Sequence, residues 1–235
     1  MKRILIKYSL FLCLVVLAGN VKGQYYYFDR GLVEVNVGVA IPFFNFGDQN
    51  GIESAHYAKT GFNAGGSVAY FYSKHVAMEF NLNYNIHGVN TNKLADAYFH
   101  TDTINNISAA ATVGSFHDFS GAVGFRFDLP VSEQFSFVFK MMSGLRGVHK
   151  PGATINLVTI YGPSRIVETS DTQVKFAFYS AFGGRIKITE KLGVHVMVSY
   201  IGSNLNFEFT KNKVPVVTNE HLGVIMVNAG VGLSF

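Results

Sequence analysis

The stretch Val76-Ala-Met-Glu-Phe-Asn-Leu-Asn-Tyr-Asn-Ile-His87 alternates apolar and polar residues almost without exception. Because successive side chains of a β-strand point to opposite faces, this segment would have one apolar face and one polar face. In a soluble sheet the apolar face packs against a core, whereas in a membrane barrel it contacts lipid. The alternation therefore predicts a strand, and the fold depends on which of its faces points inward.

The N-terminal residues have the three-part layout of a secretory signal peptide. A basic start is followed by an apolar run at residues 8–17 and by a small, polar segment at residues 18–23. The apolar run is too short to span a bilayer as a helix. We expect residues 1–23 to be a signal peptide cleaved after Gly23, and residues 24–235 to form a single domain.

Cleavage would change the charge of the chain. The whole chain has 19 basic and 15 acidic residues, and the first 23 residues hold four of the basic residues and no acid. Nineteen minus four leaves fifteen basic residues against fifteen acids, so the exported chain would be formally neutral. This balance excludes an electrostatic argument for nucleic-acid binding. The single cysteine, Cys13, lies in the apolar run, so neither a disulfide nor a cysteine nucleophile is expected.

The composition favours a protein that is surrounded by lipid. Charged residues make up 14% of the chain, against roughly 25% in an ordinary soluble domain. Aromatic residues also make up 14%, yet no uninterrupted apolar stretch follows residue 24. A chain this apolar that lacks a transmembrane helix indicates a barrel in lipid.

Eight segments alternate in the same way as the opening stretch. They cover residues 32–42, 61–72, 76–87, 119–129, 135–141, 172–188, 194–200 and 225–235. Short connections (73–75, 130–134 and 189–193) alternate strictly with longer ones (43–60, 91–117, 143–171 and 203–221). This rhythm predicts an all-β fold: a closed antiparallel eight-stranded transmembrane β-barrel with short periplasmic turns and long extracellular loops.

The polar face of each predicted strand is expected to point inward. The apolar faces are bulky, and the opposite faces mix small and polar residues, as in the interior of a narrow barrel. Aromatic residues such as Tyr70, Tyr72 and Phe127 lie near strand ends, where an interfacial girdle would be. The alternative, a secreted lipocalin-like barrel or β-sandwich, would need strand faces rich in Lys and Glu, whereas residues 76–87 contain a single acid, Glu79.

Charged residues on the inward faces are expected to form an ion-pair network that plugs the lumen. The network residues are Glu34, Glu79, Arg126, Asp128, Lys140, Lys175, Arg185 and Lys187, with His195 as a further member. Because an unpaired buried charge is costly, Glu34 and Glu79 should accept hydrogen bonds from Arg126, Lys140 or Arg185. An ion pathway along the same residues is the alternative.

No catalytic residue, cofactor site or metal site is predicted. Acid–base residues do occur in the long connections: Glu53, His56, His100, Asp102, His117, Asp118, His149 and His221. Their spacing matches no nucleophile elbow, no HExxH zinc motif and no glycine-rich phosphate loop. An outer-membrane lipid hydrolase or protease that uses the loop histidines remains an alternative hypothesis.

Two of the long connections contain further strand patterns. Residues 153–160 and 165–169 read as strand, turn and strand, so a hairpin should protrude beyond the membrane and offer an edge to a partner strand. A second extension, residues 205–209, follows the seventh strand. Its apolar residues are shifted by one position, which predicts a β-bulge near residues 202–204.

The N-terminal pattern, the strand and loop rhythm and the closing Val231-Gly-Leu-Ser-Phe235 together resemble a known family. This family is the small eight-stranded outer-membrane barrels of Gram-negative bacteria, which include the OmpA transmembrane domain, OmpX and the PorT-like group. The resemblance implies an outer-membrane location and a terminal Phe235 that is read by the barrel-assembly machinery. Outer-membrane lipid and an extracellular or secretion-system protein are the other partners it implies.

The resemblance is weak for function, because one fold hosts unrelated roles. It implies a structural, surface-recognition or secretion-accessory role without enzymatic activity. A small pore or transporter is the alternative.

Overall fold

The computed structural model describes residues 29–48, 57–100 and 105–235. The predicted signal peptide, its cleavage point and Cys13 lie outside these residues. Within the described ranges, no helix is both long enough and apolar enough to span a membrane.

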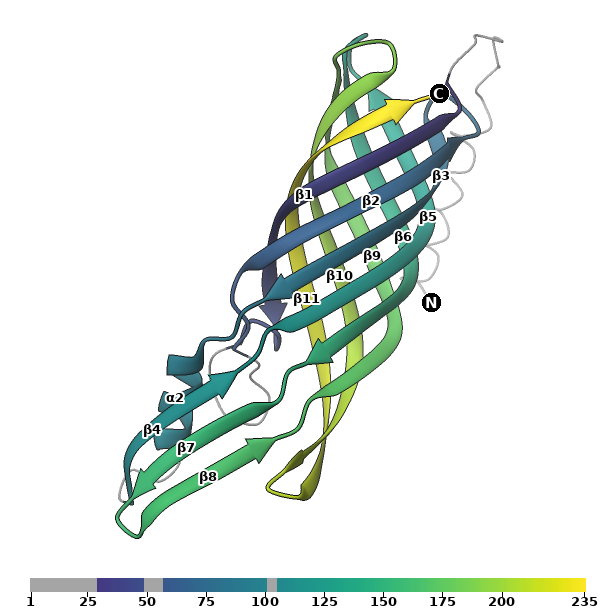
Figure 1. The fold of residues 1–235 in the computed structure, drawn as a ribbon. Coiled ribbons are helices and arrows are strands. Elements are labelled where there is room, and N and C mark those ends of the chain that lie inside the picture. The colour runs from purple at the N-terminus through teal and green to yellow at the C-terminus, as the bar shows by residue number, and fades with distance from the viewer. Residues whose placement is uncertain (1–28, 49–56, 101–104) are drawn as a thin grey trace, which may run out of the picture.

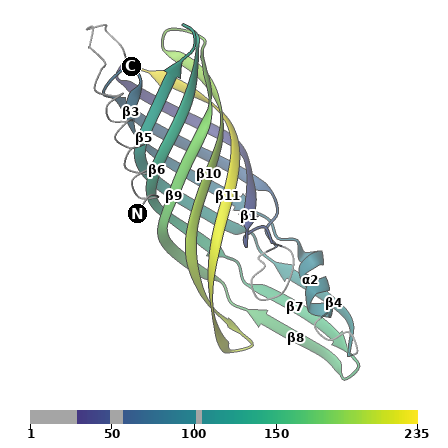
Figure 2. The same ribbon diagram turned by 180° about the vertical axis from the view of Figure 1, so that it is seen from behind.

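Eight antiparallel strands form a ring (Figures 1 and 2). They are β1 (Gly31–Phe44), β2 (Gly61–Phe71), β3 (Val76–His87), β5 (Phe116–Pro130), β6 (Phe135–Lys150), β9 (Asp171–Lys187), β10 (Leu192–Lys211) and β11 (Val214–Ser234). Each strand pairs with the next one along the ring, and β11 pairs with β1. The predicted all-β, antiparallel fold is confirmed, and the opening stretch forms β3 with the predicted bounds.

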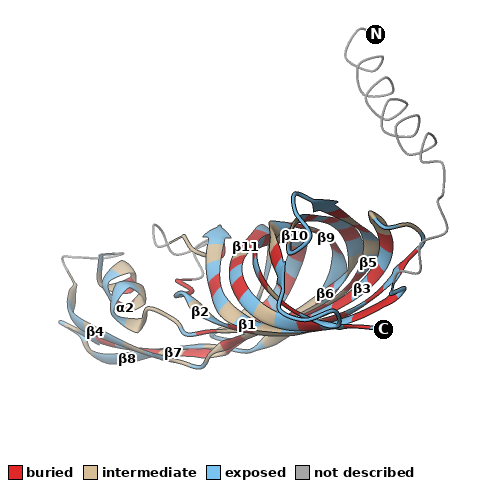
Figure 3. Cartoon of the chain, turned by 90° about the horizontal axis from the view of Figure 1, so that it is seen from above, coloured by how far each residue is buried: buried red, intermediate tan, exposed pale blue. Residues whose placement is uncertain are grey.

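The two faces of the ring differ in burial, as the alternating colours in Figure 3 show. On β3, Phe80 and Tyr84 point outward and are 48% and 40% exposed, whereas the intervening polar side chains of Asn81, Asn83 and Asn85 are buried. The same alternation recurs around the ring, where bulky apolar side chains cover the outside. The polar side of each strand therefore faces the interior.

Strands β6, β10 and β11 are longer than the sequence predicts, and their apolar residues change face along their length. On β10, Val198 points outward and is 50% exposed, whereas Leu205 and Phe207 point inward and are fully buried. The register with β11 is unbroken over the whole length of β10, so the predicted bulge near residues 202–204 is wrong. The ladder itself stays regular, so the apolar shift marks a change in the surroundings of β10. Beyond residue 203 the outward side chains of this strand are polar.

A second group of elements projects beyond the end of the ring opposite the C-terminus (Figure 1). We call it the platform; it consists of α2 (Thr91–Phe99), β4 (Asn106–Val113), β7 (Ala153–Thr159) and β8 (Gly162–Glu168). The strands form a sheet in the order β8-β7-β4, which joins β10 through the single pair Lys211↔Glu168. Tyr98 of α2 packs with Ala153, Ile155 and Leu157 in the core of the platform.

The predicted protruding hairpin is present as β7 and β8. The two strands keep the register of β6 and β9, because Lys150↔Asp171 is followed by Ala153↔Glu168. Residues 151–152, a Pro-Gly pair, interrupt the ladder, since proline has no backbone N–H to donate. Strand β4 was not predicted, because residues 106–113 show no clear period-2 alternation, and helix α2 was not predicted either.

Close contact between β5 and β6 leads to a prediction about their glycines. A Cβ atom on Gly124 would overlap the carbonyl oxygen of Met141, whereas one on Gly147 would meet Val174 at an ordinary 3.5 Å. We expect Gly124→Ala to lower the free energy of unfolding by about 1–3 kcal/mol through overpacking. Gly147→Ala should change it by less than about 0.5 kcal/mol. Urea titration of both variants in lipid vesicles measures the difference, and equal losses would contradict the packing of β5 against β6.

Candidate functional site

Five of the eight charged residues predicted for the lumen lie in mutual contact, and we call them the lumen cluster: Glu34, Glu79, Arg126, Asp128 and Lys140. None is more than 7% exposed. Arg126 Nη1 lies 2.7 Å from Glu34 Oε2 and 3.3 Å from Glu79 Oε2, and Arg126 Nε lies 2.6 Å from Asp128 Oδ1. Lys140 Nζ lies 3.1 Å from Glu34 Oε2 and 2.6 Å from Glu79 Oε1. Each carboxylate therefore has a cationic partner.

The contact between Lys140 and Glu34 joins opposite walls of the ring. Glu34 lies on β1 and Lys140 on β6, and these strands are four steps apart in either direction around the eight-strand ring. A 3.1 Å contact between them crosses the interior. At this level the cross-section is occupied by side chains, as expected for a barrel of this size.

The three other predicted network residues lie outside the lumen cluster. Arg185 is buried but donates to Ser234 Oγ at 2.8 Å, and it forms no ion pair with the carboxylates of the described residues. Lys187 is exposed at the rim, where the β9–β10 ladder ends. Lys175 is exposed as well, because it lies beyond Ala177↔Ser203, the last pair at the other end of that ladder.

His195 lies next to the cluster, with Nδ1 3.6 Å from Glu34 Oε1. The cluster itself holds three carboxylates and two cations. Arg185 interacts electrostatically with Arg126 as well as with Glu34 and Asp128; counted with it, the buried groups here comprise three carboxylates and three cations. Formal neutrality of this kind lowers the cost of burying charges.

A second buried ion pair lies nearer the platform and was not predicted. Arg146 donates from Nε to Asp118 Oδ1 at 3.0 Å and from Nη2 to Asp118 Oδ2 at 2.7 Å, and both side chains are fully buried. Arg146 also donates to the Leu222 carbonyl at 2.7 Å, and Asn85 Nδ2 donates to Asp118 Oδ2 at 3.1 Å. The predicted placement of Asp118 in a long connection is therefore wrong, because it lies on β5. Arg146 lies six residues after Lys140 on the same strand, and this even spacing places both side chains on the inward face. That spacing is the signal that could have revealed the pair.

Apolar side chains occupy the interior beyond this pair. Phe46 packs edge-on against His87 and Phe116, with ring centroids 4.9 and 5.1 Å apart. Leu205 and Leu222 belong to the same buried cluster. The inward face is thus charged near the C-terminal rim and apolar near the platform.

The histidines that the structure describes in the long connections hydrogen-bond to different partners. His117, His149 and His221 bond to Tyr84, Thr172 and Asn204, respectively, at side chains that are exposed or half-buried. His100 is exposed, and Glu53, His56 and Asp102 lie outside the described residues. Across residues 29–48, 57–100 and 105–235, no three His, Cys, Asp or Glu side chains are placed to hold a metal ion.

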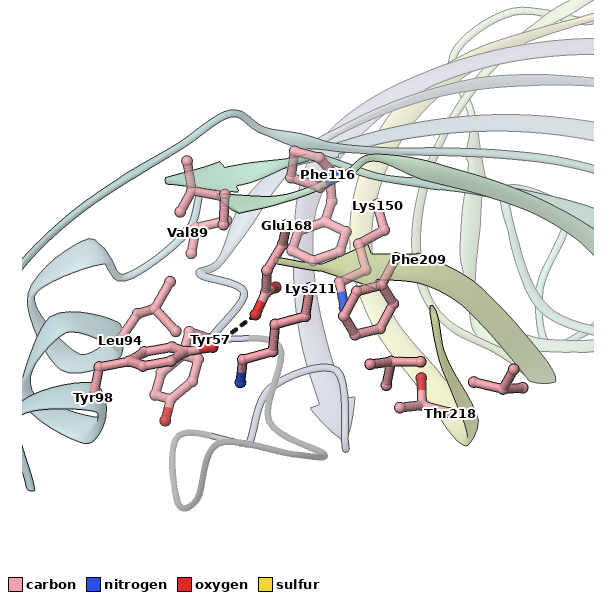
Figure 4. A pocket seen from close by; sticks show the side chains of 15 residues that line it. Tyr57, Val89, Leu94, Tyr98, Phe116, Lys150, Glu168, Phe209, Lys211 and Thr218 are labelled. Atoms are coloured by element: carbon pink, nitrogen blue, oxygen red, sulfur yellow. Dashed lines mark hydrogen bonds between the residues drawn. The ribbon is translucent and has the colours of Figure 1, made fainter. Parts of the chain in front are cut away.

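A pocket of about 330 Å³ lies between the platform and the far end of β10 and β11 (Figure 4). Most of its wall is apolar, and its charged members are Lys150, Glu168 and Lys211. Tyr98 Oη donates to Glu168 Oε1 at 2.6 Å. Lys150 Nζ lies 3.6 Å from the centroid of the Phe209 ring, and Lys211 Nζ lies 4.8 Å from that of Tyr98.

The pocket shifts the proton affinities of two of these side chains. Burial and the hydrogen bond to Glu168 both raise the pKa of the Tyr98 hydroxyl, so it stays protonated and remains a donor. Lys150 is the last residue of β6, beyond the outward apolar side chains of that strand. Burial lowers the pKa of its ammonium group, and the nearby carboxylates of Glu168, Glu220 and Asp171 offset this only in part.

Asp171 connects the base of the platform to the β10 extension. Its Oδ2 accepts from the backbone N–H of Glu208 at 2.8 Å and from Gln173 Nε2 at 3.0 Å, and its Oδ1 accepts from the Thr172 N–H at 2.7 Å. Burial alone would raise the pKa of Asp171, but these hydrogen bonds outweigh it and hold the pKa below its usual value.

Comparison with known proteins adds structural neighbours only. No protein-family model and no curated protein sequence matches the chain. Ail, the attachment invasion locus protein of Yersinia pestis, is similar at 11% identity, with 89% of this chain and 100% of that chain covered and a TM-score of 0.46. The outer membrane protein OprG from Pseudomonas aeruginosa is similar at 10% identity, with 88% and 97% covered and a TM-score of 0.45. Neisserial surface protein A is similar at 11% identity, with 87% and 97% covered and a TM-score of 0.45.

The class of the chain follows from its own geometry. It is a small antiparallel β-barrel with an apolar exterior, a polar interior and a platform at one end. Its candidate sites are the lumen cluster and the pocket.

The lumen cluster predicts that its cations are needed for stability. Lys140→Met would leave Glu34, Glu79 and Asp128 sharing Arg126, so we expect the free energy of unfolding to fall by about 3–5 kcal/mol. Adding Glu79→Gln to this variant should restore part of the loss, because it removes the excess buried charge. Lys187→Met, at an exposed lysine, is the matched control, with an expected change below about 0.5 kcal/mol. Denaturant titrations in vesicles give these values, and a Lys140→Met variant as stable as the control would rule out the buried network.

Asp171 predicts a local effect that depends on pH. In Asp171→Ala the Glu208 amide loses its acceptor, and we expect its hydrogen exchange to be roughly tenfold faster. Because the pKa of Asp171 is lowered by folding, its stabilising contribution is complete above the usual aspartate pKa and is lost as the pH falls through the lowered value. The difference in exchange should therefore persist into mildly acidic solution. Glu190→Ala, at an exposed acid of the other rim, should leave the Glu208 amide unchanged.

Proposed function

We propose that the chain is an integral outer-membrane barrel, exported by the signal peptide at residues 1–23, with a plugged lumen and a non-enzymatic role in surface recognition. The observation that carries the proposal is the polarity of the barrel, which is apolar outside and charged inside. A water-soluble barrel would hide side chains such as Phe80, Phe125 and Phe182, which are 48%, 50% and 56% exposed. An apolar belt of this extent on a barrel requires lipid.

The change of face on β10 supports the same proposal. Apolar side chains point outward along the ring and inward beyond it, as expected where a strand leaves hydrocarbon for water. The platform then lies on the watery side, at the end opposite the short turns. Short turns are typical of the periplasmic rim, so the platform would be extracellular.

A plugged lumen is supported by the contacts across the interior. The lumen cluster joins opposite walls, the Asp118–Arg146 pair fills the next level, and apolar rings follow. A small pore or transporter, the alternative, would need a continuous aqueous path past all three levels.

The platform supports a role in recognition. Its sheet ends at β4, whose outer edge pairs with no further strand among the described residues, and an open edge can pair with a strand of another protein. At the tip of the β7–β8 turn, Tyr161 is 85% exposed and Ile160 is 58% exposed. Exposed apolar side chains of this kind favour a protein partner. A secretion-accessory role is a second form of the same proposal, motivated by the resemblance to PorT-like barrels.

The proposed membrane location and the proposed plugged lumen can be tested in one set of experiments. The purified protein should need detergent to stay monomeric, should migrate anomalously on gels until boiled, and should be cut by protease on intact cells only in the platform and the long loops. In planar bilayers it should show no stable open-channel current. A monomeric, folded protein in plain buffer would exclude the membrane location, and a large steady conductance would exclude the plug.

A further inference from the structure

The pocket beside the platform combines features that the surface-recognition proposal does not use. Two lysines, a mostly apolar wall and a buried hydroxyl meet in one cavity of about 330 Å³ (Figure 4). They come from distant parts of the chain: Lys150 from β6, Glu168 from β8, and Lys211 and Thr218 from β10 and β11.

Neither lysine is neutralised by direct contact with a carboxylate of the described residues. Lys150 and Lys211 instead lie over aromatic rings, those of Phe209 and Tyr98. A ring face stabilises an ammonium group only weakly, and it leaves the N–H donors available to a stronger acceptor. Two positively charged ammonium groups with available N–H donors therefore border one cavity.

The carboxylates near the pocket already have partners. Glu168 accepts the hydroxyl of Tyr98, which fixes its position in the wall. Asp171 accepts three hydrogen bonds and does not line the cavity, and Glu220, which also has a partner, does not line it either. The lining alone has two cations and one anion, a formal charge of +1.

Thr218 provides a polar group without a partner. Thr218 lines the cavity, and its Oγ1 is buried and has no hydrogen-bond partner among the described residues. A buried hydroxyl is normally satisfied, and an exception points to a missing partner. A bound carboxylate oxygen would accept its hydrogen.

We propose that this pocket binds a small monocarboxylate with an apolar or aromatic body, as part of the proposed surface-recognition role. The ligand carboxylate bonds to the lysine ammonium groups and the Thr218 hydroxyl. Its body lies against the apolar wall, where Leu94, Val113 and Phe116 face the cavity. The net charge of the lining favours a monoanion over a dianion, and pockets of this composition are typical of small-molecule sites.

Titration of isotope-labelled full-length protein in lipid nanodiscs tests the proposal. The probe is 4-phenylbutyrate, and the readout is the backbone amide resonances of Ala153, Glu168 and Thr218. We expect saturable shifts at these amides. Acetate should bind more weakly because it lacks the apolar body, and 4-phenylbutan-1-ol and 4-phenylbutylamine should bind more weakly because they lack the negative charge.

Variants of the polar groups separate recognition from general partitioning into the bilayer. Lys150→Met and Lys211→Met should each raise the Kd for 4-phenylbutyrate by about tenfold or more, as expected for a lost charge-assisted hydrogen bond. Lys213→Met removes the same charge from an exposed position two residues away and should change the Kd by less than about twofold. Thr218→Val should weaken binding without lowering stability, because it also removes an unsatisfied buried group.

The proposal fails if 4-phenylbutan-1-ol or the amine shifts these amides as strongly as the carboxylate, if Lys211→Met binds like Lys213→Met, or if no shift occurs at about 10 mM probe, which corresponds to negligible affinity. Lys211 is half-buried, so its variant remains informative even if Lys150→Met does not fold. A barrel that conducts ions but still binds the probe would contradict only the proposed plugged lumen. A barrel that does not conduct and does not bind the probe would contradict only the proposed binding pocket.

Discussion

The contact between Lys140 and Glu34 is the constraint on which the interior depends. An ammonium group on one wall and a carboxylate on the opposite wall meet at 3.1 Å, and Arg126 and Glu79 complete the pairing. Burying these charges is costly unless they are paired. The pairing requires a narrow ring and inward alternation on four strands, so the width and the register of the barrel are coupled to its charges.

The outside of the barrel obeys the complementary constraint. Backbone groups satisfied by the ring allow a largely apolar outer surface, which lipid can solvate. Where that surface ends, the apolar residues of β10 move to the inner face without any break in register. One continuous strand therefore belongs to two environments, and its side-chain pattern changes with the surroundings rather than with the backbone.

The platform depends on the barrel for its position and forms the wall of the pocket. Strands β7 and β8 continue the register of β6 and β9 past a Pro-Gly interruption, and β4 and α2 pack against them. Asp171 connects the same region to the β10 extension through the Glu208 N–H. The pocket exists because two extensions of the ring lie next to each other. One is the platform, and the other is the far end of β10 and β11; neither forms a closed ring by itself.

The sequence by itself determined the alternation of each strand and therefore which residues share a face. It predicted β3 to the residue and brought Glu34, Glu79, Arg126, Asp128 and Lys140 to one face, since parity is a local property of the chain. It did not bring Arg146 to Asp118, because both residues lie outside the predicted strands 119–129 and 135–141. Which inward charges meet, why Lys175 and Lys187 stay in solvent, and how Lys150, Lys211 and Thr218 come to share a cavity were decided by the tertiary structure. These contacts depend on ring closure, on strand length and on where each ladder ends, and such pairings across the chain are not encoded in any single segment.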